Sequence, residues 1–198
     1  IRTIAGIPGG AILPFYDALH GGAIRHVLTR HEQGAGFIAQ GMARTTGRAA
    51  VCLATSGPGA TNLLTAIADA KLDSVPLVAI TGQVSQPLIG TDAFQEVDMY
   101  GLTLPITKHN FLVRSAAELM ETVPLAFEIA ESGRPGPVSI DVPKDVQTAE
   151  IEVDRLPEPG RARPMPPCAD ALIDALAARL TAARQPVLYL GGGVIASG

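Results

Sequence analysis

The 198-residue chain is poor in the residues that bind nucleic acids. It has no tryptophan, its aromatic content is 4%, and its formal net charge is -4 at pH 7. Phosphodiester backbones require a basic surface, and unpaired bases require aromatic side chains on which to stack. The composition therefore predicts no nucleic acid partner.

Long hydrophobic runs and paired cysteines are also missing. No run approaches the roughly 20 consecutive apolar residues of a membrane-spanning helix, and no basic segment precedes an apolar one as in a signal peptide. The two cysteines, Cys52 and Cys168, lack the spacing of a disulfide framework or a metal site. These absences predict a cytoplasmic protein in a reducing compartment, with no membrane segment.

Short β-branched runs alternate with helical patterns, which is typical of βα units and a parallel sheet. Several of the runs are apolar throughout, as in strands that helices cover on both faces. We predict an α/β fold, with a parallel central sheet flanked by helices. The predicted strands are Thr3 to Ile7, Ile24 to Leu28, Ala50 to Thr55, Leu77 to Thr81, Ile106 to Val113 and Val138 to Val142. The predicted helices are Ala11 to Leu19, Gly34 to Thr45, Ala60 to Leu72 and Ala116 to Glu131, with Pro124 expected to kink or restart the last.

A proline-rich stretch follows this pattern and predicts an extended linker. We assign residues 1–147 to a first domain, 148–167 to the linker, and 168–198 to the start of a second α/β domain. The second domain is predicted to hold a helix around Leu172 to Leu180 and a strand at Val187 to Leu190. Because the chain begins almost inside a strand and stops after a glycine-rich turn, we expect a fragment of a larger protein, cut at both ends.

Glycine-rich segments follow three of the predicted strands. They are "GIPGGAI" (residues 6–12), "ATSGPGATNL" (54–63) and "TGQ" (81–83). In open parallel sheets, ligands bind at the carboxyl ends of the strands. None of the segments has the pattern of a P-loop, a Gly-x-Gly-x-x-Gly loop or a Gly-x-Ser-x-Gly elbow. From the residues alone, each loop is therefore either a binding loop or a structural turn.

Glu32 lies at the same predicted edge, where a strand gives way to a helix. His31 and Glu32 do not form a His-Glu-x-x-His zinc motif, because the position of the second histidine holds Ala35. No metal site is predicted within this chain. A carboxylate at a helix N-terminus stabilises the helix by about 0.3–1 kcal/mol. Glu32 is therefore either a residue that interacts with the helix dipole or a catalyst.

Six motifs occur together in one order: "GIPGG", "RHEQGAGFIAQGMAR", "SGPGATNL", "TGQVSQPLIGTDAFQE", "SGRPGPVSIDVPKDVQ" and "LYLGGG". This combination closely resembles the acetolactate synthase large catalytic subunit family, which depends on thiamin diphosphate, and the resemblance covers essentially the whole chain. It implies that residues 1–147 form most of a pyrimidine-binding (PYR) domain and that residues 168–198 open a central, FAD-associated domain. It also implies the joining of a pyruvate-derived hydroxyethyl group to a second 2-keto acid, in branched-chain amino-acid synthesis.

The resemblance further implies roles for individual residues. Glu32 matches the catalytic glutamate whose carboxylate bonds the pyrimidine ring N1′ of the cofactor. The residues that match cofactor contacts are Gly9, Gly10, Pro58 and Asn62 for thiamin diphosphate, and Arg134, Gly191, Gly192 and Gly193 for FAD. Phe94, Gln95 and Lys144 match residues of the substrate channel.

Further partners follow from the resemblance alone. In this family a separate C-terminal domain of the neighbouring subunit holds the diphosphate and Mg²⁺ through a Gly-Asp-Gly...Asn motif, which residues 1–198 lack. We therefore expect a homodimer or higher homo-oligomer, a possible small regulatory subunit, and an inactive isolated fragment. Two alternatives stay open: another thiamin-diphosphate enzyme, such as a pyruvate oxidase or a 2-keto acid decarboxylase, and a non-catalytic dimerising domain.

Overall fold

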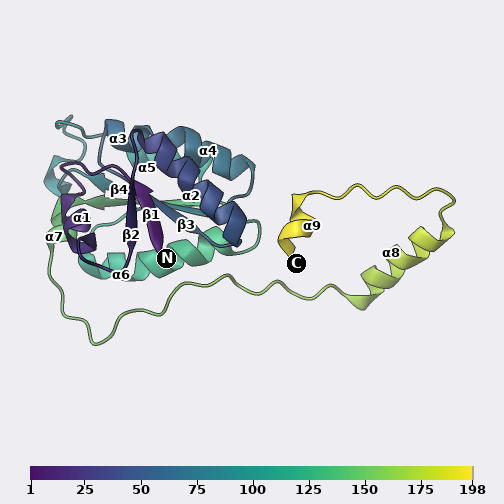
Figure 1. The fold of residues 1–198 in the computed structure, drawn as a ribbon. Coiled ribbons are helices and arrows are strands. Elements are labelled where there is room, and N and C mark those ends of the chain that lie inside the picture. The colour runs from purple at the N-terminus through teal and green to yellow at the C-terminus, as the bar shows by residue number, and fades with distance from the viewer. Residues whose placement is uncertain (198) are drawn as a thin grey trace. The chain divides into compact units, whose positions relative to one another are not determined.

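A computed structural model describes residues 1–197 (Figure 1). The chain separates into two compact units, Ile1–Arg163 and Pro164–Gly198. The first unit holds all six strands of the sheet and every helix as far as α7 (Lys144–Thr148). The second unit holds helices α8 (Asp170–Ala182) and α9 (Gly192–Ser197).

The sheet of the first unit is parallel throughout, and its strand order is β2-β1-β3-β4-β6-β5. The strands are β1 (Thr3–Gly6), β2 (Arg25–Leu28), β3 (Ala50–Ala54), β4 (Leu77–Gln83), β5 (His109–Leu112) and β6 (Pro137–Pro143). Strands β3, β4 and β6 are buried along their whole length, as expected of strands with helices on both faces. The prediction of a parallel sheet flanked by helices is therefore confirmed.

The helices of the first unit connect these strands. They are α1 (Leu13–Leu19), α2 (Glu32–Thr46), α3 (Pro58–Thr61), α4 (Leu64–Leu72), α5 (Met99–Thr103), α6 (Ala116–Glu131) and α7, with 3₁₀ turns at Gln86–Leu88 and Leu104–Ile106. Helices α2 and α4 lie on one side of the sheet, and α6 runs along the other (Figure 1). The arrangement is a three-layer α/β fold.

The two faces of the sheet carry side chains of different size. The face under α6 is built from branched residues, including Val51, Leu53 and Ile140. The face under α2 and α4 is rich in alanine, which lets these helices pack closely. At Gly36 of α2, an added Cβ would lie 2.5 Å from the Cβ of Ala66 in α4, so only glycine permits this approach.

Three predicted elements differ in detail. The predicted helix at 60–72 is two helices, because the Leu63 amide bonds to the Ala60 carbonyl three residues back and tightens the chain there. The predicted strand at 106–113 begins only at His109, after a 3₁₀ turn that contains Pro105. Helix α6 does not restart at Pro124, and that residue lies inside its 16-residue span.

The predicted strand at Val187 to Leu190 is wrong. These residues have no regular secondary structure, and Tyr189 is 98% exposed. A strand needs a neighbouring strand to satisfy its amides and carbonyls, and no part of the chain that the structure describes pairs with this segment. The predicted helix in this unit is present as α8.

No helix among the described residues is both long enough and apolar enough to cross a membrane.

Candidate active site at the carboxyl edge of the sheet

The loops after β1 and β3 meet where the strand order reverses. The connection through α1 leads outward to β2, and the connection through α2 returns past β1 to β3. In doubly wound sheets this reversal opens a crevice at the carboxyl ends of the strands. Thr55 joins the two loops there, because its Oγ1 accepts a hydrogen bond from the Ala11 amide at 3.3 Å. A Cβ on Gly9 would lie 2.5 Å from the Thr55 Cβ.

Glu32 is the first residue of α2, but it does not cap that helix. The N-cap is His31, whose Nδ1 accepts a hydrogen bond from the Gln33 amide at 3.1 Å. The Glu32 carboxylate turns instead toward Asn62, whose Nδ2 donates to Oε2 at 2.9 Å. Within residues 1–197, no hydrogen-bond donor contacts Oε1. The half-buried carboxylate is therefore held at one oxygen and open at the other.

Gly59 leaves room for that carboxylate. A Cβ at this position would lie 3.3 Å from Glu32 Oε1 and 2.7 Å from the Thr55 Cγ2. Any side chain here would displace Thr55 or Glu32. The glycine of "SGPG" therefore serves close packing around the candidate catalytic carboxylate.

Two other ionisable groups near this edge remain neutral. Burial, reinforced by the negative charges that Cys52 and Glu32 can carry, raises the pKa of the Tyr16 phenol. The Tyr16 hydroxyl lies 3.2 Å from His26 Nε2. Burial also raises the pKa of the Cys52 thiol to about 12, so this cysteine is a protonated core residue and not a nucleophile.

The loop between β4 and α5 approaches the loop after β3 at the same edge. Gly57, with φ +58°, faces the backbone of Gln95, and a Cβ on Gly57 would lie 2.5 Å from the Gln95 carbonyl oxygen. Gln95 itself has φ +58°. Its neighbour Phe94 is 88% exposed. The structure thus brings the predicted channel residues to the edge that holds Glu32.

A buried polar cluster that the sequence analysis missed supports this loop. Asp141 of β6 accepts hydrogen bonds from Thr81 Oγ1 at 2.6 Å and from Gln83 Nε2 at 2.9 Å. Burial raises the pKa of Asp141 to about 7, although the two hydrogen bonds oppose that shift; the charge of Asp98 adds to it. Thr81 and Gln83 alternate along an otherwise apolar strand, a spacing that could have indicated a shared polar face.

The remaining predicted residues divide between three places. Lys144 begins α7 at the carboxyl edge, where Gly10 and Pro58 are also exposed. Arg134 lies at the opposite, amino edge, where its Nε donates to Ser74 Oγ at 2.8 Å and its Nη2 to the Leu72 carbonyl at 3.2 Å. The structure therefore does not bring Arg134 to Glu32. Gly191, Gly192 and Gly193 belong to the second unit, around the start of α9.

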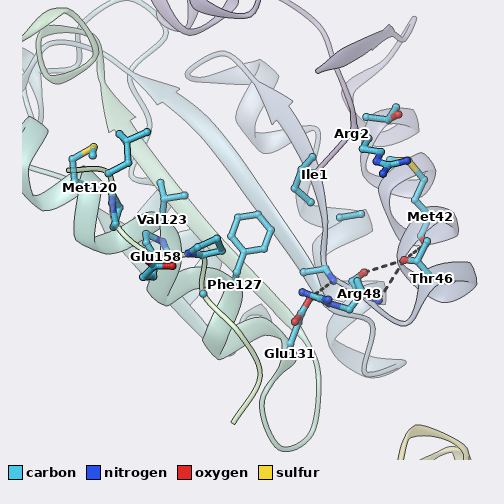
Figure 2. Close-up of a pocket in the computed structure, with 18 of the residues that line it drawn as sticks. Ile1, Arg2, Met42, Thr46, Arg48, Met120, Val123, Phe127, Glu131 and Glu158 are labelled. Carbon is cyan, nitrogen blue, oxygen red and sulfur yellow. Dashed lines mark hydrogen bonds and ion pairs between the residues drawn. The ribbon is translucent and has the colours of Figure 1, made fainter. Parts of the chain in front are cut away.

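A cavity of about 890 Å³ also opens at the amino edge (Figure 2). Phe127 and Val123 of α6 form one wall, and Arg48 and Thr46 stand opposite. Arg48 Nε lies 2.9 Å from Glu131 Oε1, so this cationic side chain is already paired. Glu32 is not among the residues that line the cavity. The largely apolar cavity is therefore separate from the candidate site.

Comparison with known proteins agrees with the geometry. The acetolactate synthase isozyme 1 large subunit of Escherichia coli (strain K12) is 63% identical over 98% of this chain and 35% of its own length. The acetolactate synthase large subunit of Corynebacterium glutamicum is 55% identical over 97% of the chain and 31% of its own length. A probable acetolactate synthase large subunit of Methanocaldococcus jannaschii is 52% identical over 100% of the chain and 34% of its own length.

This chain thus spans about a third of the length of the curated relatives it matches. Residues 1–102, more than half of it, match the family described as "Thiamine pyrophosphate enzyme, N-terminal TPP binding domain". The matched range contains Glu32, Asn62 and the loops around them. The chain belongs to the thiamine pyrophosphate enzyme family, and its residues 1–102 match the N-terminal domain of that family.

Proposed function

We propose that the complete protein carrying this chain is an acetolactate synthase catalytic subunit. It decarboxylates pyruvate with thiamin diphosphate and joins the two-carbon unit to a second 2-keto acid, in branched-chain amino-acid synthesis. The names of its relatives support the reaction. The observation that carries the proposal is the Glu32 carboxylate, which His31 frees from helix capping and Asn62 holds at a single oxygen.

The residues present fit an aminopyrimidine. The site offers one open carboxylate oxygen, and an added Cβ on Gly10, in the loop after β1, would meet nothing within 4 Å. Thiamin diphosphate, when bound, supplies the electron sink for decarboxylation. Glu32 Oε1 would hold a proton shared with a pyrimidine ring nitrogen, and Asn62 would keep the carboxylate oriented. Gly10 and Pro58 would complete the contacts to the ring.

Other residues have secondary roles in the proposal. Phe94, Gln95 and Lys144, all exposed at the carboxyl edge, would line the approach of the 2-keto acid. Arg134, with Gly191, Gly192 and Gly193, would contact FAD. The rest of the protein would supply the Mg²⁺ ligands. We expect a homodimer or higher homo-oligomer in the cytoplasm, and we infer a small regulatory subunit from the word "large" in the relatives' names.

Product analysis tests the reaction. The complete protein is incubated in air with pyruvate, thiamin diphosphate, Mg²⁺, FAD and inorganic phosphate, and acetolactate is the expected product. Acetaldehyde would indicate a 2-keto acid decarboxylase, and acetyl phosphate would indicate a pyruvate oxidase. Either result would replace the proposed reaction while keeping the same cofactor.

The exposed apolar side chains at this edge favour a second candidate for the chain by itself. Phe94 is 88% exposed and Leu28 is 67% exposed, as in a surface that another chain covers. Residues 1–198 alone would then be a non-catalytic domain that dimerises. Calorimetry with thiamin diphosphate, with and without the remainder of the protein, separates the two roles. We expect the isolated chain to be inactive.

A further inference from the structure

We propose that Gln83 and Asp141 are positioning residues that hold the loop at residues 89–98 against the cofactor loop and thereby set the affinity for the 2-keto acid. This inference rests on the proposed function, since that function makes Phe94 and Gln95 of the loop channel residues. Neither Gln83 nor Asp141 needs to touch substrate.

Gln83 uses its whole amide group in this role. Nε2 donates to the Val97 carbonyl at 2.9 Å and to Asp141 Oδ2 at 2.9 Å. Oε1 accepts from the Val84 amide at 2.8 Å. These partners fix which end of the amide is oxygen, because an amide hydrogen must meet an acceptor and a carbonyl must meet a donor. The side chain is 2% exposed, so water cannot replace these bonds at low cost.

Asp141 fixes the orientation of Gln83. It faces Thr81 across the ladder between β4 and β6, and its two oxygens accept separately from Thr81 and Gln83. No lysine, arginine or histidine in the described chain forms an ion pair with Asp141. The carboxyl group therefore acts through hydrogen bonds. The neutral acid keeps the same pattern, with Oδ2 accepting from Gln83 and the proton on Oδ1 directed at Thr81 Oγ1, and burial favours that form.

The loop is held at two points only a few residues apart. Gln83 holds the Val97 carbonyl, and Gly57 packs against the backbone of Gln95. Asp98, the next residue along, caps α5 by accepting from the Gly101 amide at 2.9 Å. Loss of the Gln83 bond would leave the Val97 carbonyl with only the Met99 amide, two residues along the same chain segment, and would free residues 91–97 from β4.

The Glu32 site is built from other elements. Glu32 and Asn62 belong to α2 and to the end of α3, and their hydrogen bond does not involve Gln83. Freeing the loop should therefore weaken binding of the 2-keto acid and leave the affinity for thiamin diphosphate nearly unchanged. If Gln83 had only a structural role, its replacement would change both the affinity for the 2-keto acid and the affinity for thiamin diphosphate, or neither of them.

Gln83→Leu in the complete holoenzyme tests the proposal. We expect the KM for pyruvate to rise about tenfold, as for loss of a hydrogen bond to a buried group, and the Kd for thiamin diphosphate to change by less than about twofold. The matched control is Gln40→Leu. Gln40 is 3% exposed and donates from Nε2 to the Ala66 carbonyl at 2.8 Å, but it lies on α2, away from the loop. The Gln40→Leu variant should lose a similar amount of stability and keep the wild-type KM for pyruvate.

Asp141→Asn and Asp141→Leu provide a second test. Asparagine can accept from Gln83 and donate to Thr81, as the neutral acid does, so it should keep the wild-type KM, whereas leucine should reproduce the KM of Gln83→Leu. If Gln83→Leu does not fold, Gly57→Ala breaks the other attachment and should raise the same KM. An unchanged KM in Gln83→Leu, or an equal rise in Gln40→Leu, would overturn the proposal.

Amide hydrogen exchange distinguishes this failure from failure of the proposed function. Exchange at residues 91–97 should be faster in Gln83→Leu than in Gln40→Leu, whatever reaction the enzyme catalyses. A wild-type protein that makes no acetolactate, yet shows this faster exchange, would refute the reaction and keep the attachment. Unchanged exchange would refute the attachment itself.

Discussion

Polar side chains at the two edges of the parallel sheet have different kinds of partner. At the amino edge, Arg48 is paired with Glu131, and Arg134 bonds to the Ser74 hydroxyl and the Leu72 carbonyl. At the carboxyl edge, the carboxyl groups of Glu32 and Asp141 have no cationic partner within residues 1–197. Their contacts come from neutral amides and a hydroxyl.

This difference separates cationic groups that are paired with their neighbours from carboxyl groups that only neutral donors hold. At the amino edge, Arg48 and Arg134 already donate hydrogen bonds to neighbouring groups of the fold. Glu32 is held by a single neutral donor, so its second carboxylate oxygen is available to a ligand. Asp141 is buried, and burial favours its protonated form. Groups of this second kind are found where binding and catalysis take place. Variants at the two edges should accordingly change different measurements.

The largest expected effect is at Glu32. Glu32→Gln should lower the kcat for acetolactate formation by between about 100-fold and 10,000-fold, because an amide can bond Asn62 but cannot accept a proton at the open position. Steady-state rates with saturating thiamin diphosphate measure this. Glu118→Gln is the control, since Glu118 lies in the first turn of α6 and accepts from the Arg114 amide at 2.7 Å. Equal rates in both variants would remove Glu32 from the mechanism.

Asp141 should produce the next largest effect, in stability rather than rate. Its folded pKa of about 7 exceeds the ordinary value of 3.8. The fold therefore prefers the neutral acid, and its stabilising contribution is complete below pH 3.8 and is lost as the pH rises toward 7. That loss is up to about 4 kcal/mol. Urea unfolding of wild type and Asp141→Asn should show the variant gaining relative stability over this interval, and parallel curves would contradict the shift.

Substitution of Gly57 separates the stability cost of steric crowding from that of backbone strain. Gly57→Ala should destabilise the protein by about 2–4 kcal/mol, because an L-residue is strained at φ +58° and its Cβ would meet the Gln95 carbonyl. Gly21→Ala is the matched control, with φ +74° and open space around an added Cβ. Its expected cost is about 1 kcal/mol. Urea midpoints for both variants measure the difference, and equal costs would show that the loops do not press on each other.

The sequence was sufficient for the parallel sheet because its strands are continuous apolar runs separated by helical patterns. It failed where an element depends on a neighbour. Val187 to Leu190 has the composition of a strand but no strand to pair with among the described residues. The break between α3 and α4 depends on a tight turn at Leu63, which an unbroken helical pattern does not reveal.

The sequence named candidate residues for the site but did not predict the contacts between them. The resemblance pointed to Glu32 and Asn62, yet their contact spans 30 residues and depends on how α2 packs beside α3. The capping role of His31 could not be read from the sequence either, since its ring replaces the usual serine or aspartate. Asp141 was missed because a lone acidic residue in a buried strand reveals its partners only when the register of β4 and β6 is known.

The smallest expected effect is at the amino edge, where Arg48 tests whether the paired groups take no part in the chemistry. Arg48→Met should destabilise the protein by about 1–2 kcal/mol, because the Arg48 side chain is 67% exposed but Glu131 is only 7% exposed and would keep just its hydrogen bond from the Ala49 amide at 2.8 Å. Acetolactate formation should not change. Urea unfolding and steady-state rates, measured on the same preparation, test both statements. A loss of rate as large as that of Glu32→Gln would mean that the amino edge takes part in the chemistry, and the division between the two edges would then be wrong.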